Sequence, residues 1–360
     1  MVIGACAPTP APAPTPAPAP TPAPAPAPAF KPPSLLVFGG TSETGSGFMM
    51  SQAFGAVLKE KTGVDVRVQP TTQSRDRMGL IRSGEAIFLE YSPLEAVFYS
   101  RGIQDANDDG WGPQTLRAVW LTGPKPFGFA VAADSDIYTA ADLKGKKITT
   151  FSGYLTGEYY INGLIAFANL KEGDYTPVPV GSSKGGYAAL LEGKSDVMWI
   201  TVTASSAIEQ DSSPHGLRWI PLPPEDKEAW ARLQAANPIA VPMRAEVGPA
   251  TPVDTWGYSG NYVTYSWQDE EMVYWMTKQV VELYEDYKDK QSLLPNWTRE
   301  NIAAIEQTTM PFHPGAIKYY KEIGIWTAEY ETIQQQRLAK EKQQIEDWKK
   351  ANPTWKWNSG

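Results

Sequence analysis

From residue 35 onward the sequence repeats one order of local patterns. A short apolar run leads into a loop rich in Gly, Ser and Thr, and the loop leads into a segment with helical periodicity; the first such unit is LLVFGGTSETGSGFMMSQAFG, residues 35–55. Successive strand, loop and helix units build parallel sheets with helices on both faces, and ligands bind such sheets at the carboxyl ends of the strands. The pattern therefore predicts an α/β fold whose site is made by the loops that follow strands.

The predicted units fall into two series. The first has strands at 35–38, 64–70 and 86–91, followed by two longer strands, LRAVWLTG and PFGFAVAADS, on either side of GPKP. A second series of strands and helices runs from about residue 146 to 222. A strand near 255–266 and then mostly helices complete the chain, including an amphipathic helix over 269–289 with apolar residues at Met272, Val273, Met276, Val280 and Tyr284.

Composition excludes several classes of protein. The net charge is −8, and the Lys and Arg residues are scattered, which argues against a nucleic-acid partner. The chain has one cysteine, Cys6, and two histidines, His215 and His313, which lie far apart in the sequence. Neither a disulfide framework nor a Cys/His metal site is expected, and the sequence indicates no cofactor.

Residues 1–34 differ from the rest of the chain. They alternate Pro with Ala or Thr, a composition typical of an extended polyproline-like spacer that offers no apolar side chains to bury. The tetrad that ends at Cys6, Ile-Gly-Ala-Cys, is similar to a bacterial lipobox, although a charged and apolar signal segment does not precede it. We expect Cys6 to be lipidated and the spacer to be a membrane tether; a chance cysteine in a low-complexity tail is the alternative.

The first loop does not match the common nucleotide and catalytic motifs. Gly40 and Gly45 have phosphate-loop spacing, but Ser46 and Gly47 follow where Lys and Ser/Thr are required, and the dinucleotide and nucleophile-elbow spacings also fail. What remains is a loop of hydroxyls and N–H groups at the start of a helix, which suits a small carboxylate. The stretches TTFSGYLTGEYY and PVGSSKGG in the second series have the same arrangement of a hydroxyl-rich loop before a helix.

Several longer stretches carry a resemblance to a known family. They are FGGTSETGSGFMMSQAFGAVLKEKTG, GFAVAADSDIYTAADLKGKKI, FSGYLTGE, YAALLEGKSDVMWIT and MPFHPGAIKYYKEIG. Together they resemble the solute receptors of tripartite ATP-independent periplasmic (TRAP) transporters, specifically the TAXI branch, over about residues 35–325. The resemblance implies the two-lobed fold of a type II periplasmic binding protein, with the ligand cleft between the lobes.

The resemblance also implies which residues bind the ligand. Carried over by position, the ligand-binding residues are Thr41, Ser42, Gly45, Ser46, Gly47, Phe48, Thr72, Ser74, Tyr91, Ser92, Ser152, Gly153, Thr156, Gly157 and Thr203, to which we add Tyr258 because it lies near the expected hinge. The second loop departs from the family's Gly-Ser-Gly-Thr pattern by carrying Tyr154 and Leu155, which predicts a wider or more apolar cleft than a glutamate site. Each of these residues also has a structural interpretation: turn glycines, helix caps, or core aromatic residues.

The sequence thus predicts an extracytoplasmic receptor without enzymatic activity. Lobe I is expected over 35–130 and 250–325, lobe II over 131–249, and a helical tail over 326–360, either packed by a thin stripe or reaching a partner. The expected ligand is a small organic anion, either a carboxylate or an amino acid, and the expected partner is a TRAP-type membrane permease. The alternatives are a receptor for a membrane signalling protein, or an enzyme on the same fold.

Overall fold

A computed structural model of the chain describes residues 1, 4, 30–43, 45–71, 73–108, 110–211, 216–246, 248–249 and 251–356. The chain divides into two compact units, Met1–Lys31 and Pro32–Gly360. Cys6, nearly all of the predicted spacer and His215 lie outside the described residues. The second unit contains every helix and strand described below.

The elements follow in chain order. The strands are β1 (Leu35–Gly40), β2 (Asp65–Pro70), β3 (Phe88–Tyr91), β4 (Leu116–Ala132), β5 (Lys147–Phe151), β6 (Thr176–Val180), β7 (Met198–Thr201), β8 (Leu217–Trp219), β9 (Val241–Ala245) and β10 (Val253–Tyr265). The α-helices are α1 (Ser46–Thr62), α2 (Ser74–Arg82), α3 (Pro93–Arg101), α4 (Leu155–Phe167), α5 (Ser183–Leu191), α6 (Ser205–Asp211), α7 (Lys227–Ala236), α8 (Glu270–Glu282), α9 (Tyr284–Tyr287), α10 (Arg299–Ile302), α11 (Pro314–Glu322) and α12 (Ala328–Ala351). Short 3₁₀ helices cover Gln104–Ala106, Ala140–Leu143, Lys288–Lys290, Leu294–Asn296 and Ile305–Gln307.

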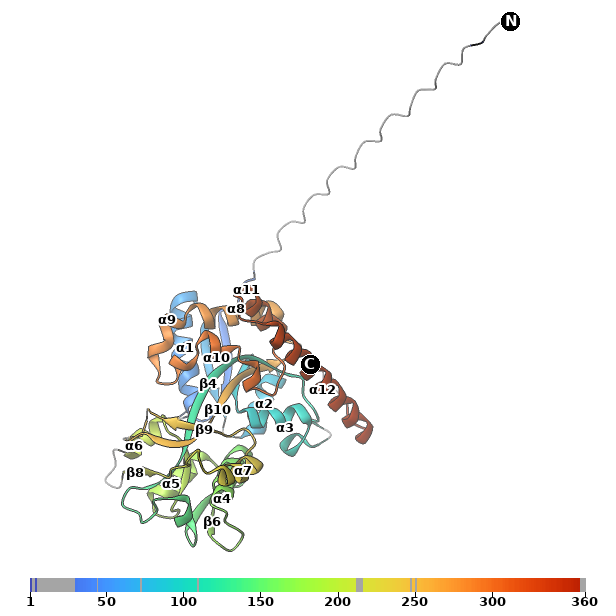
Figure 1. Cartoon of the computed structure of the whole chain (residues 1–360). Helices are drawn as coiled ribbons and strands as arrows, with labels where there is room; N and C mark the ends of the chain where they lie inside the picture. The colour runs from blue at the N-terminus through green and yellow to red at the C-terminus, as the bar shows by residue number, and fades with distance from the viewer. Residues whose placement is uncertain are drawn as a thin grey trace. The chain divides into compact units, whose positions relative to one another are not determined.

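Two long strands, β4 and β10, form the centre of the main sheet. The strand order is β2-β1-β3-β10-β4-β7, with β9 paired to β10 and β8 paired to β4. Strands β1, β2 and β3 are mutually parallel, whereas β10 is antiparallel to β3 and β4. Figure 1 shows β4 running from the part of the body that carries α1 and α10 to the part that carries α4, α5 and β6. The separate pair β5-β6 is parallel.

The region around GPKP differs from the prediction. Two strands were expected there, but residues 116–132 form one continuous strand of 17 residues. The register between β4 and β10 shifts between Ser259 and Asn261, so the ladder bulges there and resumes at Ser259 opposite Pro124. Pro124 and Pro126 lie within the ladder, opposite Ser259 and Gly257, and do not interrupt the strand.

The helices begin and end largely as their sequence patterns predict. The helix α1 ends at Gly63, whose φ of 77° is the left-handed cap conformation that glycine adopts without strain. The predicted helix over 269–289 is divided instead into α8, which buries Met272, Val273, Met276 and Val280, and the short α9, which begins at Tyr284.

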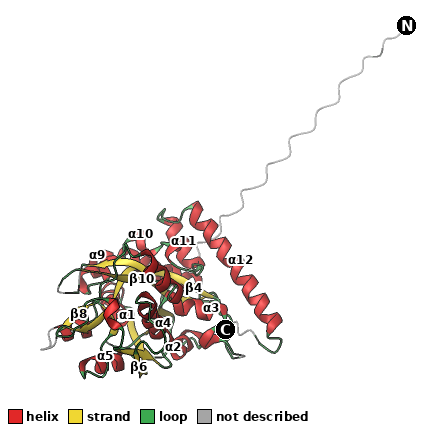
Figure 2. Ribbon diagram, turned by 60° about the horizontal axis from the view of Figure 1, so that its bottom comes forward, coloured by secondary structure: helices red, strands yellow, loops and turns green. Residues whose placement is uncertain are grey.

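The C-terminal helix α12 packs on the body by a narrow stripe, and Figure 2 shows it along one side of the molecule. Gln334 exchanges two hydrogen bonds with the backbone of Phe312, and Glu341 forms a two-pronged ion pair with Arg117. These contacts hold α12 through a few side chains, and Gln334 is the one residue of the helix that is buried.

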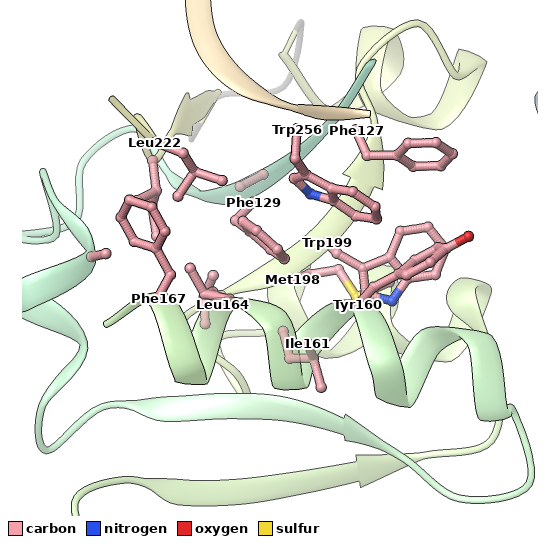
Figure 3. Close-up of a cluster of buried hydrophobic side chains, with 14 of the residues drawn as sticks. Phe127, Phe129, Tyr160, Ile161, Leu164, Phe167, Met198, Trp199, Leu222 and Trp256 are labelled. Atoms are coloured by element: carbon pink, nitrogen blue, oxygen red, sulfur yellow. The ribbon is translucent and has the colours of Figure 1, made fainter. Parts of the chain in front are cut away.

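One large hydrophobic core lies beside the lower part of β4. Figure 3 shows Phe127, Trp256, Tyr160 and Trp199 gathered at one end of this cluster, and Phe167, Leu164 and Leu222 at the other end. Residues of α4 provide one side of the cluster, since Tyr160, Ile161 and Leu164 are all buried on that helix. The aromatic end of the core thus joins residues of β4, β7 and β10 to α4.

Among the described residues, no helix is long and apolar enough to cross a membrane. In the same part of the chain, no group of three or more His, Cys, Asp and Glu residues is placed to hold a metal ion.

Candidate ligand-binding site

A cavity of about 180 Å³ lies where the loops after β1, β5 and β6 meet strands β4, β7 and β10. It is lined by Thr41, Ser42, Gly45, Ser46, Gly47, Thr71, Arg77, Glu90, Ser92, Glu95, Lys125, Phe127, Tyr154, Thr156, Tyr160, Ser182, Ser183, Lys184, Tyr187, Trp199, Ile200, Thr201, Ala204 and Tyr258. We refer to the part contributed by α1, α2 and α3 as the α1–α3 side. The part contributed by α4, α5 and β7 is the α4–α5 side.

Three helices begin at this cavity. Ser46 and Gly47 start α1, Thr156 lies in the first turn of α4, and Ser183 starts α5. The α4 and α5 starts are neighbours because β5 and β6 pair in parallel and the Ser152 N–H donates to the Val180 carbonyl. No side chain caps α1 or α4, so N–H groups of their first turns lack intrahelical partners. These ends carry partial positive charge and suit an anion.

Two buried polar groups on the α4–α5 side have no hydrogen-bond partner in the described part of the chain. They are the Thr156 hydroxyl and the Trp199 indole N–H, on residues that are 2% and 5% exposed and that line the cavity. Leaving a buried polar group unsatisfied costs about 1–3 kcal/mol. A ligand in the cavity would supply the missing hydrogen-bond partners through its acceptor atoms.

The charged groups on the α1–α3 side are already paired. Arg77 donates to Glu95 at 2.6 Å, and the two side chains are 1% and 3% exposed. Ser74 also donates to Glu95. Burial alone would lower the pKa of Arg77, but the Glu95 carboxylate, together with Tyr91, Tyr154 and Glu90, more than offsets this effect and the pKa is raised. The guanidinium is therefore charged and held in place.

A second buried ion pair lies between Lys125 on β4 and Glu90 on β3, at 2.7 Å. The Glu90 carboxylate is packed directly against the first turn of α1, so a Cβ at Gly47 would overlap it. Glycine is required at this close approach. Because a carboxylate already occupies the space beside Gly47, the α1 start is less open to a ligand anion than the α4 and α5 starts.

A chain of hydroxyl groups joins the two sides of the cavity. Ser92, the N-cap of α3, lies 3.2 Å from the Tyr160 hydroxyl, and Tyr160 donates to Tyr258 on β10 at 2.6 Å. Burial raises the pKa of both tyrosines well above the usual value, so both hydroxyls stay protonated. A further contact between the sides is the hydrogen bond from Gln104 to the Tyr159 hydroxyl, at 3.1 Å.

Aromatic rings form much of the α4–α5 side. Tyr154 and Trp199 have ring centroids 6.1 Å apart with planes tilted by 39°, and Trp199 meets Tyr160 edge to face at 4.9 Å. Tyr187 of α5 also lines the cavity. In Figure 3, Tyr160 and Trp199 lie together at the aromatic end of the core. The cavity wall is thus an extension of the hydrophobic core.

The structure brings part of the predicted site together. The predicted residues that line the cavity are Thr41, Ser42, Gly45, Ser46, Gly47, Ser92, Thr156 and Tyr258. They come from the loop after β1, the start of α3, the start of α4 and strand β10, as the strand-end argument anticipates.

The other predicted residues have different places. Phe48 borders a separate shallow groove, Ser74 hydrogen-bonds Glu95, and the Tyr91 ring lies under Arg77 at 5.2 Å. Thr72 lies outside the described residues.

On the α4–α5 side, Ser152 and Gly153 are exposed and do not line the cavity. Gly157 packs against the rings of Tyr154 and Phe151. Thr203 is buried, and its hydroxyl lacks a partner among the described residues, but it does not line the cavity.

Sequence reasoning missed the charged and aromatic lining. The missed residues include Arg77, Glu90, Glu95, Lys125, Tyr160, Lys184, Tyr187 and Trp199, whereas Tyr154 was anticipated as part of the cleft. A signal was present for two of them, since Glu90 lies within the apolar run AIFLEY and Lys125 within LTGPKPFGF. A charge inside an otherwise buried strand needs a partner or a function.

Comparison with known proteins places this geometry in a family. The model of the NMT1-like family matches residues 38–324. No curated protein matches the chain. The topology confirms the predicted α/β class, with an additional C-terminal helix.

Solved structures similar to this chain include three binding proteins. The periplasmic aliphatic sulphonate binding protein SsuA from Escherichia coli is 14% identical, with a TM-score of 0.45 over 91% of this chain and 93% of that one. PhnD1 from Prochlorococcus marinus, in complex with methylphosphonate, is 11% identical, with a TM-score of 0.48 over 81% and 99%. A periplasmic binding protein from Brucella ovis with glutathione bound is 13% identical, with a TM-score of 0.44 over 70% of each chain.

Proposed function

We propose that this chain, which belongs to the NMT1-like family, is an extracytoplasmic solute receptor that binds a small organic anion in the cavity between α1–α3 and α4–α5. The observation that carries the proposal is the pair of buried, unpartnered groups at the cavity, the Thr156 hydroxyl and the Trp199 N–H. Both groups can donate; Thr156 lies in the uncapped first turn of α4, and Trp199 lies on strand β7. Donors converging on one small space are complementary to an anion.

The charges of the cavity support an anionic ligand. The positively charged residues that line the cavity are Arg77, Lys125 and Lys184. The negatively charged residues are Glu90 and Glu95. The two carboxylates are matched by Arg77 and Lys125 in the buried ion pairs, which leaves Lys184 and the helix starts to act on a ligand. We place the ligand's anionic group on the α4–α5 side, because Glu90 occupies the space beside the α1 start.

The receptor proposal includes closure of two lobes around the ligand. The proposed lobes are residues 35–130 with 250–325, and residues 131–249, so that the chain crosses between them at the end of β4 and just before β10. Bending of these strands would open the cavity, and the Ser92–Tyr160–Tyr258 chain would form on closing. A membrane partner can then recognise the closed form.

The proposed partner is a TRAP-type permease, and a lipid on Cys6 would hold the receptor at the membrane. The competing role is a receptor that signals through a membrane protein. A multi-span permease encoded beside this chain, and uptake that requires both proteins, would support transport. The intact mass of the native protein reports whether Cys6 carries a lipid.

The binding proposal is tested by native mass spectrometry followed by calorimetric titration. The full chain is purified without refolding, small molecules that it releases are identified, and each is titrated into wild type and Thr156→Val. We expect about a tenfold or larger loss of affinity in the variant, since a hydrogen bond to a charged group is worth about 1.5–3 kcal/mol.

The matched control is Thr332→Val on the exposed part of α12, which should bind as wild type does. Equal affinity of wild type and Thr156→Val would place the site elsewhere. Release of no small molecule, together with no binding of any organic anion, would contradict the receptor function itself.

A further inference from the structure

Resting on the proposed function, we infer that the ligand is an aromatic monocarboxylate, with its ring against Tyr154, Tyr187 and Trp199 and its carboxylate at the starts of α4 and α5. This inference names a chemical class within the broader group of small organic anions. It depends on the aromatic lining, the cavity volume and the charge balance, in addition to the unpartnered donors that support the receptor role.

The aromatic lining is the first observation. Tyr154 and Trp199 are tilted by 39° with centroids 6.1 Å apart, so they form a wedge rather than a closed stack. Trp199 is fixed from behind by Tyr160, which meets it edge to face at 4.9 Å. Aromatic rings attract other rings in offset or edge-to-face arrangements worth about 0.5–1.5 kcal/mol beyond area burial. A flat ring can use these surfaces, whereas a linear, fully polar acid cannot.

The volume of the cavity is the second observation. At about 180 Å³, it is slightly larger than the engineered apolar cavity of about 150 Å³ that holds a benzene molecule. A single ring with one carboxylate therefore fits this space. The volume limits the size of the ligand whether or not the Thr156 hydroxyl and the Trp199 N–H contact it.

The charge balance of the lining is the third observation. Three cations, Arg77, Lys125 and Lys184, face two carboxylates, so the lining carries one net positive charge. Both buried cations are committed to Glu90 and Glu95 at 2.6–2.7 Å. One ligand carboxylate neutralises the remaining positive charge of the lining. A second carboxylate would lie near the α1–α3 side without a free cation and close to Glu90.

The donors of the α4–α5 side fix where the carboxylate binds. The Thr156 hydroxyl and the uncapped first turn of α4 lie at one edge, and Ser183 and Lys184 at the start of α5 lie at the other. The Trp199 N–H is a further donor from the ring wall. A carboxylate there places its attached ring against the aromatic wedge.

The test is a calorimetric titration of the full chain with acids of matched size. Benzoate and phenylacetate present a ring and one carboxylate, cyclohexanecarboxylate keeps the carboxylate without aromaticity, and glutarate is linear with two carboxylates. We expect the better of the two aromatic acids to bind at least about tenfold more tightly than cyclohexanecarboxylate and glutarate.

Two variants localise the effect. Tyr187→Leu removes an aromatic ring but keeps an apolar side chain, so it should reduce the aromatic preference at least about threefold. Lys184→Met should weaken every carboxylate and abolish the salt dependence of binding. The matched controls are Tyr138→Leu and Lys171→Met, which change exposed residues away from the cavity lining and should leave affinities unchanged.

The outcomes separate this inference from the receptor function. Tighter binding of glutarate or cyclohexanecarboxylate, or native mass spectra that show a non-aromatic solute, would overturn the aromatic class and leave the receptor role intact. An aromatic monocarboxylate released from the native protein would support the inference even when the four test acids bind weakly. Failure of all four acids, with no small molecule released, would overturn both.

Discussion

The two sides of the cavity are built differently. On the α1–α3 side the charged groups are paired within the protein: Arg77 with Glu95, and Lys125 with Glu90. On the α4–α5 side Thr156 and Trp199 have buried polar atoms without a partner among the described residues. The ion pairs of the first side form without a ligand, although the Arg77 Nε also lacks a partner among the described residues. The polar groups of the second side have no such pairing. We therefore expect the α1–α3 side to determine stability and the α4–α5 side to determine affinity.

The largest expected effect comes from breaking a buried ion pair on the α1–α3 side. Arg77→Met leaves the Glu95 carboxylate buried without its cation, which typically costs about 3–5 kcal/mol. Urea denaturation followed by tryptophan fluorescence measures the loss. The control is Asp65→Asn, which breaks the Lys59–Asp65 pair; its side chains are 59% and 47% exposed, and the expected cost is at most about 1 kcal/mol. If Arg77→Met lowers the free energy of unfolding by less than about 1 kcal/mol, the α1–α3 side does not determine stability.

A medium effect is expected where the two sides meet. Tyr160→Phe removes the hydroxyl that lies between Ser92 and Tyr258, and a buried hydrogen bond contributes about 0.5–1.5 kcal/mol. If these bonds form on closing, their loss reduces the population of the closed state, and affinity should fall about threefold to tenfold. Titration of the identified ligand measures this change.

Tyr262→Phe is the matched control for the closing contact. Its hydroxyl bonds Ser51 at 2.6 Å, between α1 and β10 and away from the α4–α5 side. This variant should lose a similar amount of stability with no change in affinity. Equal losses of affinity in both variants would show that Tyr160 has only a structural role.

How well the sequence predicts a feature depends on how far apart in the chain its residues lie. Local patterns are sufficient for most strands and helix starts, and for the loops of Ser46 and Thr156, because periodicity and glycine stops lie within a few residues of one another. The ion pairs are non-local: Lys125 and Glu90 are 35 residues apart, and Arg77 and Glu95 are 18 apart. Nothing in either segment specifies its partner.

Two particular predictions failed for different reasons, one non-local and one local. The continuous strand β4 depends on pairing with β10, which begins more than 100 residues later. Ser152 was a plausible ligand residue because it follows a strand, but the chain turns at Gly153, with φ of 78°, before α4 begins. Thr156, inside the helix, therefore faces the cavity while Ser152 faces solvent.

The smallest expected effect is that of pH on affinity. Burial raises the pKa of Tyr154 to about 12 and that of Tyr160 and Tyr258 well above the usual value of 10, so the hydroxyls at the cavity stay protonated in neutral and mildly alkaline solution. A ligand carboxyl group with a pKa near 4 is ionised throughout the same range. Affinity should therefore change less than about twofold between pH 7 and pH 9, as measured by titration in buffers of constant ionic strength. Stability behaves differently: tyrosines whose pKa is raised by folding release protons first in the unfolded state, so their contribution is complete below pH 10 and is lost as the pH rises above it. A tenfold loss of affinity per pH unit below pH 9 would show that an ionising group contacts the ligand, and would contradict the assignment of recognition to neutral hydroxyls, the indole N–H and the helix starts.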